Sequence, residues 1–251
     1  MNNVNYIEET IKSVIKQNID LQYIIIDGGS TDGTLDIIKK YEDHIELWIS
    51  EKDFGIYDAM NKGIRYSSGE YIGIINSGDL YNVNALSTIS NYLNKNDKLD
   101  FIFGTVHKKI LKSGFNKNKI YWSFDFYPSH STGFFISNKV QKKLGLYDTN
   151  FKLSADYDLF FRLIKGRFKG IATKKSELIG YFTKDGGSYS STFNFFEQFE
   201  EEINIRLNNK QNVISILFVI LLNYFMKISK NKKRSISINQ CLNLIKKCIQ
   251  N

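Results

Sequence analysis

The sequence predicts an α/β fold built on a doubly wound, largely parallel sheet. Two observations support this prediction. Between residues 1 and 103, short apolar runs typical of buried strands alternate with segments whose apolar residues recur every three or four positions, as in amphipathic helices. In addition, 42% of the 251 residues are hydrophobic and one is proline, which favours packed regular structure around a large core.

The first expected elements are a helix, a strand and a second helix. Residues 4–15 place their apolar side chains on one helical face. The run 21–26 is almost entirely apolar and ends at Asp27, which is typical of a central parallel strand. Turn and capping residues fill the segment 27–34, and a helix with Leu35, Ile38 and Tyr41 on its inner side follows.

The same alternation predicts the next elements up to residue 103. Strands are expected at 47–49, 71–75 and 101–103, and helices at 56–64 and about 85–93. Beyond Gly104 the pattern changes, and residues 106–121 favour a hairpin that turns at Ser113-Gly114. Helices are then expected at 138–144 and 155–165, and strands at 168–173 and 178–181.

The C-terminal part differs from the rest, so we predict an α/β domain over residues 1–190 and a helical, basic extension over 191–251. Its run 213–226 is apolar except at two positions, which is shorter than the roughly 20 residues a membrane-spanning helix needs. Five lysines and arginines follow between residues 227 and 234. The segment is therefore expected either at an anionic membrane surface or packed against the domain or a partner.

The net charge of +8 originates in this extension. From Arg206 to the end the chain has nine Lys and Arg and no Asp or Glu, which leaves 25 basic and 26 acidic residues before it. A nearly neutral body argues against nucleic acid as a partner. Cys241 and Cys248 lie seven apart on one helical face and are expected to be packing residues in a reducing compartment. No leader-like segment is seen at the start, so we expect a cytoplasmic location, with peripheral association at the inner face of the cell membrane.

A candidate site follows the apolar run 71–75 directly, at Asn76-Ser77-Gly78-Asp79. Ligands of open α/β sheets bind at the carboxyl ends of strands, and hard divalent cations prefer carboxylate oxygens. We therefore expect this turn to bind a metal ion and a nucleoside diphosphate. An ordinary polar loop is the alternative interpretation.

Five segments together resemble the family 2 glycosyltransferases of the GT-A fold, most closely the bacterial members that build exopolysaccharide, capsule or O-antigen repeats. They are YIIIDGGSTDGT at 23–34, SEKDFGIYDAMNKG at 50–63, NSGD at 76–79, HSTGFF at 130–135 and ADYDLFFRL at 155–163. The likeness covers about residues 3–182. It implies transfer of a sugar, with inversion, from a UDP- or GDP-sugar to a saccharide or lipid-linked acceptor, with Mn or Mg as cofactor, in cell-surface polysaccharide synthesis.

The resemblance implies a role for three carboxylates. Asp27 stands where the family's aspartate hydrogen-bonds the nucleotide base, and a turn cap is the alternative. Asp79 stands where the family coordinates the metal ion that bridges the diphosphate. Asp156 matches the catalytic base, which takes the proton of the attacking hydroxyl. Asp158 lies about 200° round the helix from it and is expected on a solvated face.

Three further positions are implied in donor binding. Asp53 is the candidate for a donor contact in the third loop. His130 is the candidate for a diphosphate or acceptor contact, with a structural histidine as the alternative. Gly78 occupies the ribose-contacting position of the aspartate-rich turn, where many relatives carry an aspartate, so that contact would be lost or taken over by water.

The sequence also departs from the family at its beginning. Relatives open with an apolar strand in the middle of the sheet, and no such strand is expected before the helix at 4–15. Two functions therefore stay open: an active sugar transferase, and a non-catalytic remnant or interaction subunit that keeps the fold. A nucleotidyltransferase would need a glycine-rich, basic phosphate loop near the start, which the sequence does not show.

Overall fold

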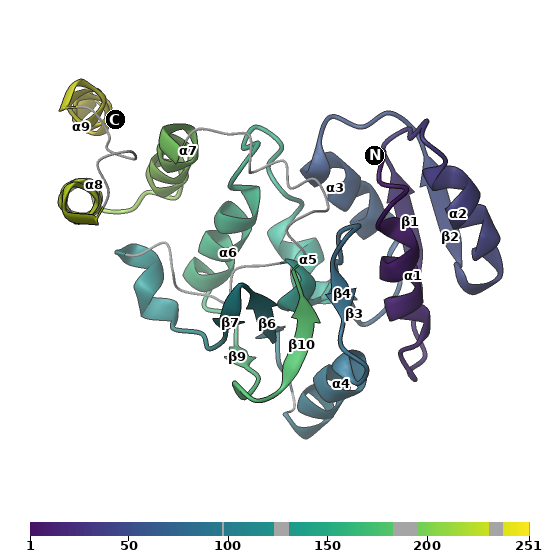
Figure 1. The fold of residues 1–251 in the computed structure, drawn as a ribbon. Coiled ribbons are helices and arrows are strands. Elements are labelled where there is room, and N and C mark those ends of the chain that lie inside the picture. The colour runs from purple at the N-terminus through teal and green to yellow at the C-terminus, as the bar shows by residue number, and fades with distance from the viewer. Residues whose placement is uncertain (97, 123–130, 183–194, 231–237, 251) are drawn as a thin grey trace.

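The computed structural model describes residues 1–96, 98–122, 131–182, 195–230 and 238–250 (Figure 1). Its helices are α1 (Ile7–Ile15), α2 (Thr34–Lys40), α3 (Ile56–Tyr66), α4 (Ala85–Lys95), α5 (Asn138–Leu144), α6 (Ala155–Lys165), α7 (Phe195–Asn208), α8 (Val213–Lys230) and α9 (Ile238–Gln250). Its strands are β1 (Ile24–Asp27), β2 (Leu47–Ser50), β3 (Tyr71–Gly73), β4 (Leu80–Tyr81), β5 (Phe101–Phe103), β6 (Thr105–Lys108), β7 (Ile110–Lys112), β8 (Phe134–Ser137), β9 (Gly170–Ala172) and β10 (Leu178–Tyr181).

The strands form mixed sheets. One pair, β1 and β2, is parallel. A second sheet has the order β3-β8-β5-β9, in which β8 runs antiparallel to both of its neighbours. A third sheet has the order β4-β10-β6-β7, closed at one side by the β6–β7 hairpin. The α/β class expected from the sequence is confirmed, but the sheets are less parallel than predicted because β8 inserts between β3 and β5.

The edges of β1 and β3 line one common cavity of about 1860 Å³. In the described part of the chain, β1 pairs with β2 alone and β3 with β8 alone. Ile24 to Ile26 and Tyr71 to Ile75 contribute to the lining. The described residues thus place no strand between β1 and β3.

The hairpin differs from the prediction. The chain turns at Lys109, whose φ is 59°, so that β6 and β7 are short, and a 3₁₀ helix at Lys117–Tyr121 replaces the expected second strand. A lysine in the left-handed region is uncommon and cannot be recognised from composition, whereas Ser113-Gly114 looked like a standard turn.

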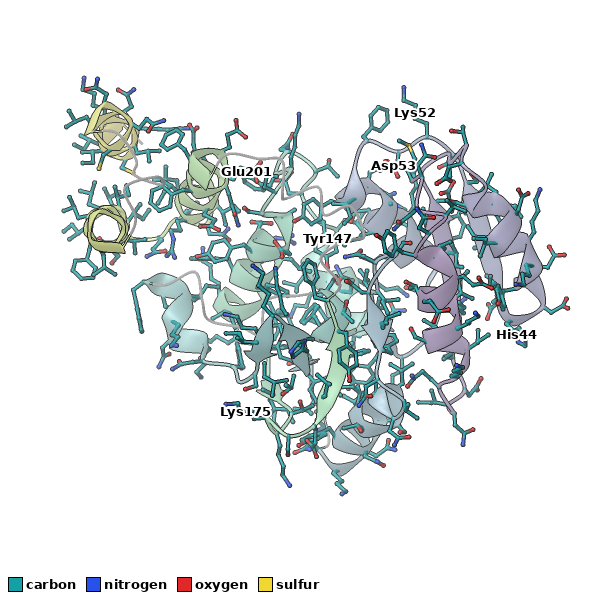
Figure 2. The ribbon with its side chains drawn as sticks, viewed as in Figure 1. His44, Lys52, Asp53, Tyr147, Lys175 and Glu201 are labelled. Carbon is teal, nitrogen blue, oxygen red and sulfur yellow. The ribbon has the colours of Figure 1, made fainter. Side chains whose placement is uncertain are left out.

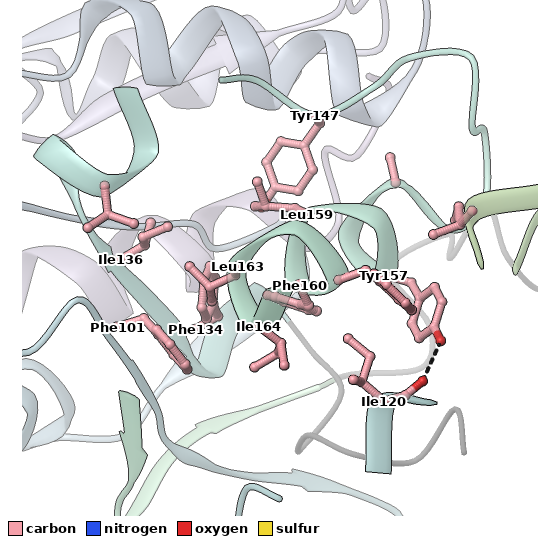
Figure 3. Close-up of a cluster of buried hydrophobic side chains, with 14 of the residues drawn as sticks. Phe101, Ile120, Phe134, Ile136, Tyr147, Tyr157, Leu159, Phe160, Leu163 and Ile164 are labelled. Carbon is pink, nitrogen blue, oxygen red and sulfur yellow. Dashed lines mark hydrogen bonds between the residues drawn. The ribbon is translucent and has the colours of Figure 1, made fainter. Parts of the chain in front are cut away.

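The largest apolar cluster surrounds α6. Phe103 of β5, Phe134 of β8 and Phe160 of α6 make ring contacts with centroids 4.7–5.3 Å apart. Figure 3 shows α6 lying over the strands that carry Phe101 and Phe134. Nearer the N-terminus of α6, the Tyr157 hydroxyl donates to the Ile120 carbonyl at 3.2 Å (Figure 3). Aromatic packing of this kind fixes the helix in place, and with it the residues at its N-terminus.

The C-terminal helices form a cluster of their own beside α6. α7 contacts α6, while α8 and α9 contact α7 and each other (Figure 1). Cys241 and Cys248 are buried on α9 against Phe199 and Ile220, which confirms their predicted packing role. No helix in the described ranges combines the length and the apolar character needed to cross a membrane.

Candidate functional site

The candidate site is the part of the cavity where several loops meet. Gly28 and Asp53 come from the loops after β1 and β2, Asp79 from the turn after β3, and Asp156 from the start of α6. Asp53 and Tyr147, which both line this cavity, are labelled in Figure 2. Segments more than 120 residues apart, residue 28 and residue 156, therefore line the same space.

The Asp27 carboxylate organises the loop after β1. Its Oδ2 accepts hydrogen bonds from the Gly29 and Ser30 N–H groups at 2.9 and 2.7 Å and from the Ser50 hydroxyl at 2.7 Å, and Oδ1 accepts from the Ser30 hydroxyl. Burial raises the pKa of Asp27, but the hydrogen bonds from Ser30 and Ser50 outweigh it and leave the pKa below its ordinary value. The carboxylate is thus ionised at neutral pH and turned into its own loop, while its neighbour Gly28 lines the cavity.

Asp53 packs directly on the backbone of Gly28. A Cβ atom on Gly28 would lie 2.2 Å from Asp53 Oδ2, so the Asp53 carboxylate would have to move aside. Asp53 Oδ1 accepts from the Gly55 N–H at 3.0 Å. Glycine at position 28 therefore leaves room for the Asp53 carboxylate beside the loop after β1.

The chain's first residues join this loop to the turn at 76–79. The Asn2 N–H donates to Ser30 Oγ at 2.7 Å and the Asn3 N–H to Thr34 Oγ1 at 2.9 Å. The Asn3 side-chain amide donates to Ser77 Oγ at 2.8 Å and to the Ser77 carbonyl at 3.1 Å. Asn3 thereby sets the separation of the two loops, a role for which the sequence carried no signal.

The 76–79 turn holds Asp79 in a buried, defined position. Gly78 has a φ of 99°, and its N–H donates to Thr10 Oγ1 at 2.9 Å. The Asp79 N–H closes the turn on the Asn76 carbonyl at 2.9 Å. Asp79 is only 3% exposed, and its Oδ2 accepts from Thr132 Oγ1 at 2.8 Å. Glycine is favoured at position 78 because few other residues adopt a positive φ.

Asp79 could be one ligand of a cation whose other ligands come from a bound phosphate group and water. Among the residues that the structure describes, no three His, Cys, Asp or Glu side chains are grouped closely enough to hold a metal ion. Mg²⁺ and similar ions are, however, commonly held by one or two carboxylates together with substrate phosphates and water. A buried carboxylate oriented by a threonine hydroxyl at the cavity wall provides such a ligand.

Asp156 lies in the first turn of α6 at the cavity wall. Its Oδ1 accepts from the Tyr157 N–H at 2.8 Å and from the Tyr57 hydroxyl at 3.3 Å. Burial, and next the Asp156 charge, raise the pKa of Tyr57 well above its ordinary value, so this hydroxyl stays a proton donor. The Tyr57 ring stacks on Tyr147 with centroids 5.5 Å apart, which fixes the hydroxyl beside the carboxylate.

The prediction that Asp158 lies on a solvated face is wrong. Asp158 is 5% exposed, pairs with Arg162 Nε at 2.8 Å and accepts from the Asn209 amide at 3.1 Å. The helix is buried almost all round, because α5, α7 and the 3₁₀ helix at Lys117–Tyr121 also pack against it. Its role is to anchor Arg162, whose guanidinium also donates to the Leu144 and Leu146 carbonyls at 2.6 and 2.8 Å.

The sequence-predicted residues thus differ in how they stand in the structure. Asp53, Asp79 and Asp156 line the cavity, Asp27 supports its wall, and Gly78 shapes the turn. His130 lies outside the described residues. Lys108 also lines the cavity; the sequence gives no sign of this, because one lysine in a short strand carries no signal of its position.

Comparison with known proteins identifies relatives of the chain. The family model "Glycosyl transferase family 2" matches residues 1–154. An uncharacterised glycosyltransferase of Rickettsia typhi is 29% identical over 216 residues, which cover 79% of this chain and 66% of the relative. Another from Mycobacterium tuberculosis strain H37Rv is 30% identical over 178 residues, 64% of either chain. A PGL/p-HBAD biosynthesis glycosyltransferase of Mycobacterium bovis strain BCG is 31% identical over 101 residues, 38% of this chain and 40% of the relative.

Solved structures share the fold. Staphylococcus aureus TarS 1–349 in complex with UDP superposes with a TM-score of 0.73 at 15% identity, over 100% of this chain and 78% of that one. The mannosyltransferase PcManGT from Pyrobaculum calidifontis, in complex with GDP-Man and Mn²⁺, superposes with a TM-score of 0.60 at 13% identity, over 97% and 76% of the two chains. The chain spans no more than 66% of the length of the Rickettsia and Mycobacterium relatives.

Proposed function

The chain belongs to glycosyl transferase family 2, and on that premise we propose that it transfers a sugar from a nucleoside diphosphate donor to a saccharide or lipid-linked acceptor. The observation that supports this most directly is that Asp79 and Asp156 line one cavity. Asp79 could bind a cation that neutralises the leaving diphosphate, and Asp156 could accept the proton of the attacking hydroxyl.

The nucleotide would lie against the loops after β1 and β2. Gly28 and Asp53 line this part of the cavity, and Asp27 holds the loop through four hydrogen bonds. A carboxylate offers about four lone-pair sites, two on each oxygen, and three of those bonds fall on Oδ2. We propose that Oδ1 accepts a hydrogen bond from an N–H group of the nucleotide base. We also propose that the donor belongs to the UDP or GDP class that the structural neighbours bind.

Asp79 would hold Mn²⁺ or Mg²⁺ together with the diphosphate oxygens. When bound, such an ion neutralises the negative charge that develops on the departing nucleoside diphosphate. The role of the protein is to hold the Asp79 carboxylate in position. The Thr132 hydroxyl orients the carboxylate, and the Gly78 turn, hydrogen-bonded to Thr10, fixes its backbone.

Asp156 would act as the general base in a single displacement. The acceptor oxygen forms a bond to the anomeric carbon while its proton passes to the Asp156 carboxylate, and the bond to the diphosphate oxygen breaks with its electron pair on that oxygen. One displacement inverts the configuration. The Tyr57 hydroxyl and the Tyr157 N–H orient the carboxylate, and such positioning is a large part of general-base efficiency.

The donor assignment is tested by calorimetry with UDP and GDP, each with and without Mn²⁺. We expect metal-dependent binding of one of them to the unaltered chain, and loss of the metal-dependent part in Asp79→Asn. The control is Asp43→Asn, which removes an exposed carboxylate far from the cavity lining. No metal-dependent binding of either nucleotide would refute the proposal. Binding without transfer across a donor screen would favour the non-catalytic subunit instead.

We further propose that the C-terminal helices hold the enzyme at the inner face of the cell membrane, where a lipid-linked acceptor of surface polysaccharide would be found. α8 exposes Ile214, Phe218 and Leu221 by 76%, 57% and 43%, and their spacing of four and three places them on one face. The segment from Arg206 onward carries nine basic and no acidic residues, which complements anionic lipid.

Flotation with vesicles of anionic and of neutral phospholipid tests this membrane contact. Ile214→Ser combined with Phe218→Ser should abolish binding to anionic vesicles, while Leu242→Ser, an exposed position on α9, should retain it. Equal binding of the double variant and the unaltered chain would contradict the proposal, and the nucleotide measurement above is independent of this result.

A further inference from the structure

Lys108 places a positive charge inside the cavity. It is the last residue of β6, is half-buried, and lines the same space as Asp79 and Asp156. Its ammonium nitrogen lies 4.3 Å from the centroid of the Phe182 ring. The Phe182 N–H donates to the His107 carbonyl at 2.9 Å, so the ring is held beside the strand that bears the lysine.

The ammonium lies within electrostatic reach of both site carboxylates. Burial lowers the pKa of Lys108, and the charges of Asp156 and Asp79 act in the opposite direction. Among the described residues, none of the ion pairs found involves Lys108. Partly buried charges in proteins are usually paired, so a lysine that lines the same cavity as two carboxylates, and forms an ion pair with neither, suits an incoming anion.

We propose that Lys108, supported by the Phe182 ring, forms a phosphate subsite between the metal ligand and the general base. The inference rests on the function proposed above, in which the reacting bond lies between Asp79 and Asp156. A lysine ammonium offers three donors and makes charge-assisted hydrogen bonds to phosphate oxygens. It also offsets the repulsion that the two carboxylates exert on an anionic ligand.

The phosphate has two chemically equivalent sources. It belongs either to the diphosphate of the donor or to a phosphate group of the acceptor, such as that of a lipid-linked saccharide. Both would bring phosphate oxygens to the space between Asp79 and Asp156. The experiment below has one arm for each source.

The test compares Lys108→Met with Lys142→Met, which removes the same charge from an exposed position on α5 outside the cavity lining. The first arm measures binding of UDP, GDP and inorganic pyrophosphate by calorimetry in the presence of Mn²⁺. The second arm measures KM for an acceptor with a phosphate group and for its neutral counterpart. Lys108→Arg, which keeps the charge, and Lys108→Gln, should Lys108→Met not fold, complete the series.

A donor contact predicts that Lys108→Met weakens binding of the nucleoside diphosphate and of pyrophosphate by about ten- to a hundredfold, as expected for a hydrogen bond to a charged group. An acceptor contact predicts unchanged donor binding and a KM raised by a similar factor for the phosphate-bearing acceptor alone. If Lys108→Met behaves like Lys142→Met in both arms, the subsite is refuted while the proposed function stands. If the unaltered chain binds no nucleotide, the proposed function itself fails.

Discussion

Glu201 on α7 caps the segment that leads into Asp156. Its Oε1 accepts from the Lys152 N–H at 2.8 Å, and its Oε2 accepts from the Leu153 and Ser154 N–H groups, both at 2.9 Å. Figure 2 shows Glu201 on α7 beside α6. A carboxylate at the N-terminal end of a helix satisfies backbone donors and favours the helix dipole. A residue of the C-terminal extension thus holds the start of the helix that carries the proposed base.

Replacing Glu201 with glutamine tests this link. Glutamine keeps the size but lacks the charge and one acceptor oxygen, so the segment 152–154 loses hydrogen bonds worth about 1–3 kcal/mol in total. We expect a lower free energy of unfolding and a lower kcat with KM for the donor unchanged, because Glu201 bonds the segment before Asp156 and not the loops proposed to bind the donor.

Glu197→Gln is the matched control, since it alters an exposed glutamate of the same helix. A kcat for Glu201→Gln equal to that of Glu197→Gln, at a temperature where both are folded, would show that the contact is structural only.

Asp156 and Asp158 should respond in opposite ways to conversion to asparagine. Asp156→Asn removes the proposed base and should abolish transfer while sparing donor binding and stability. Asp158→Asn weakens a buried ion pair with Arg162 and should lower the free energy of unfolding by about 1–3 kcal/mol. Thermal unfolding and single-turnover transfer measure the two effects. Retained transfer in Asp156→Asn would remove this residue as the base.

Gly28→Ala should displace the Asp53 carboxylate from its place beside the loop after β1. The added Cβ would meet Asp53 Oδ2 at 2.2 Å, so we expect weaker donor binding and reduced stability. Gly69→Ala is the control, because its nearest contact would be an ordinary 3.5 Å. The double variant Gly28→Ala, Asp53→Ala should regain stability but not donor affinity, as calorimetry will show. Full recovery of affinity would contradict a donor contact by Asp53.

The sequence predicted elements that depend on local pattern and missed contacts that depend on long-range packing. The bounds of α6, 155–165, were predicted as found, because its apolar spacing and polar first turn are local. The position of Asp158 was predicted wrongly, because the side of α6 that α7 covers is decided outside the helix. Glu201 lies 47 residues from Ser154 along the chain, and no pattern in an amphipathic helix marks a glutamate as the cap of another helix.

The residues of the candidate site also divide into those that local sequence pattern reveals and those that depend on long-range packing. The motif at 76–79 drew attention to Asp79, which lines the cavity, since a turn after a strand is visible in the sequence. Lys108 was missed, because the sequence does not reveal which face of a three- or four-residue strand meets the cavity. The turn at Lys109 was missed for a related reason, since its positive φ is imposed by the hairpin and not by the residue type.

Acid should weaken the contact between α1 and α2 through Glu8. Its Oε1 accepts from the Lys40 ammonium at 2.8 Å and from the Tyr41 hydroxyl at 2.7 Å, and these bonds lower the pKa of Glu8 from 4.5 to about 2. Because the pKa is lower in the folded chain than in the unfolded one, the stabilisation is present above pH 4.5 and is lost as the pH falls towards 2. The free energy of unfolding of Glu8→Gln, measured with urea, should therefore fall less steeply with decreasing pH over this range than that of the unaltered chain. Glu9→Gln is the control, because Glu9 is on the same helix but its side chain is 66% exposed; its free energy of unfolding should follow that of the unaltered chain. The same pH dependence in the unaltered chain, Glu8→Gln and Glu9→Gln would show that Glu8 does not couple the two helices.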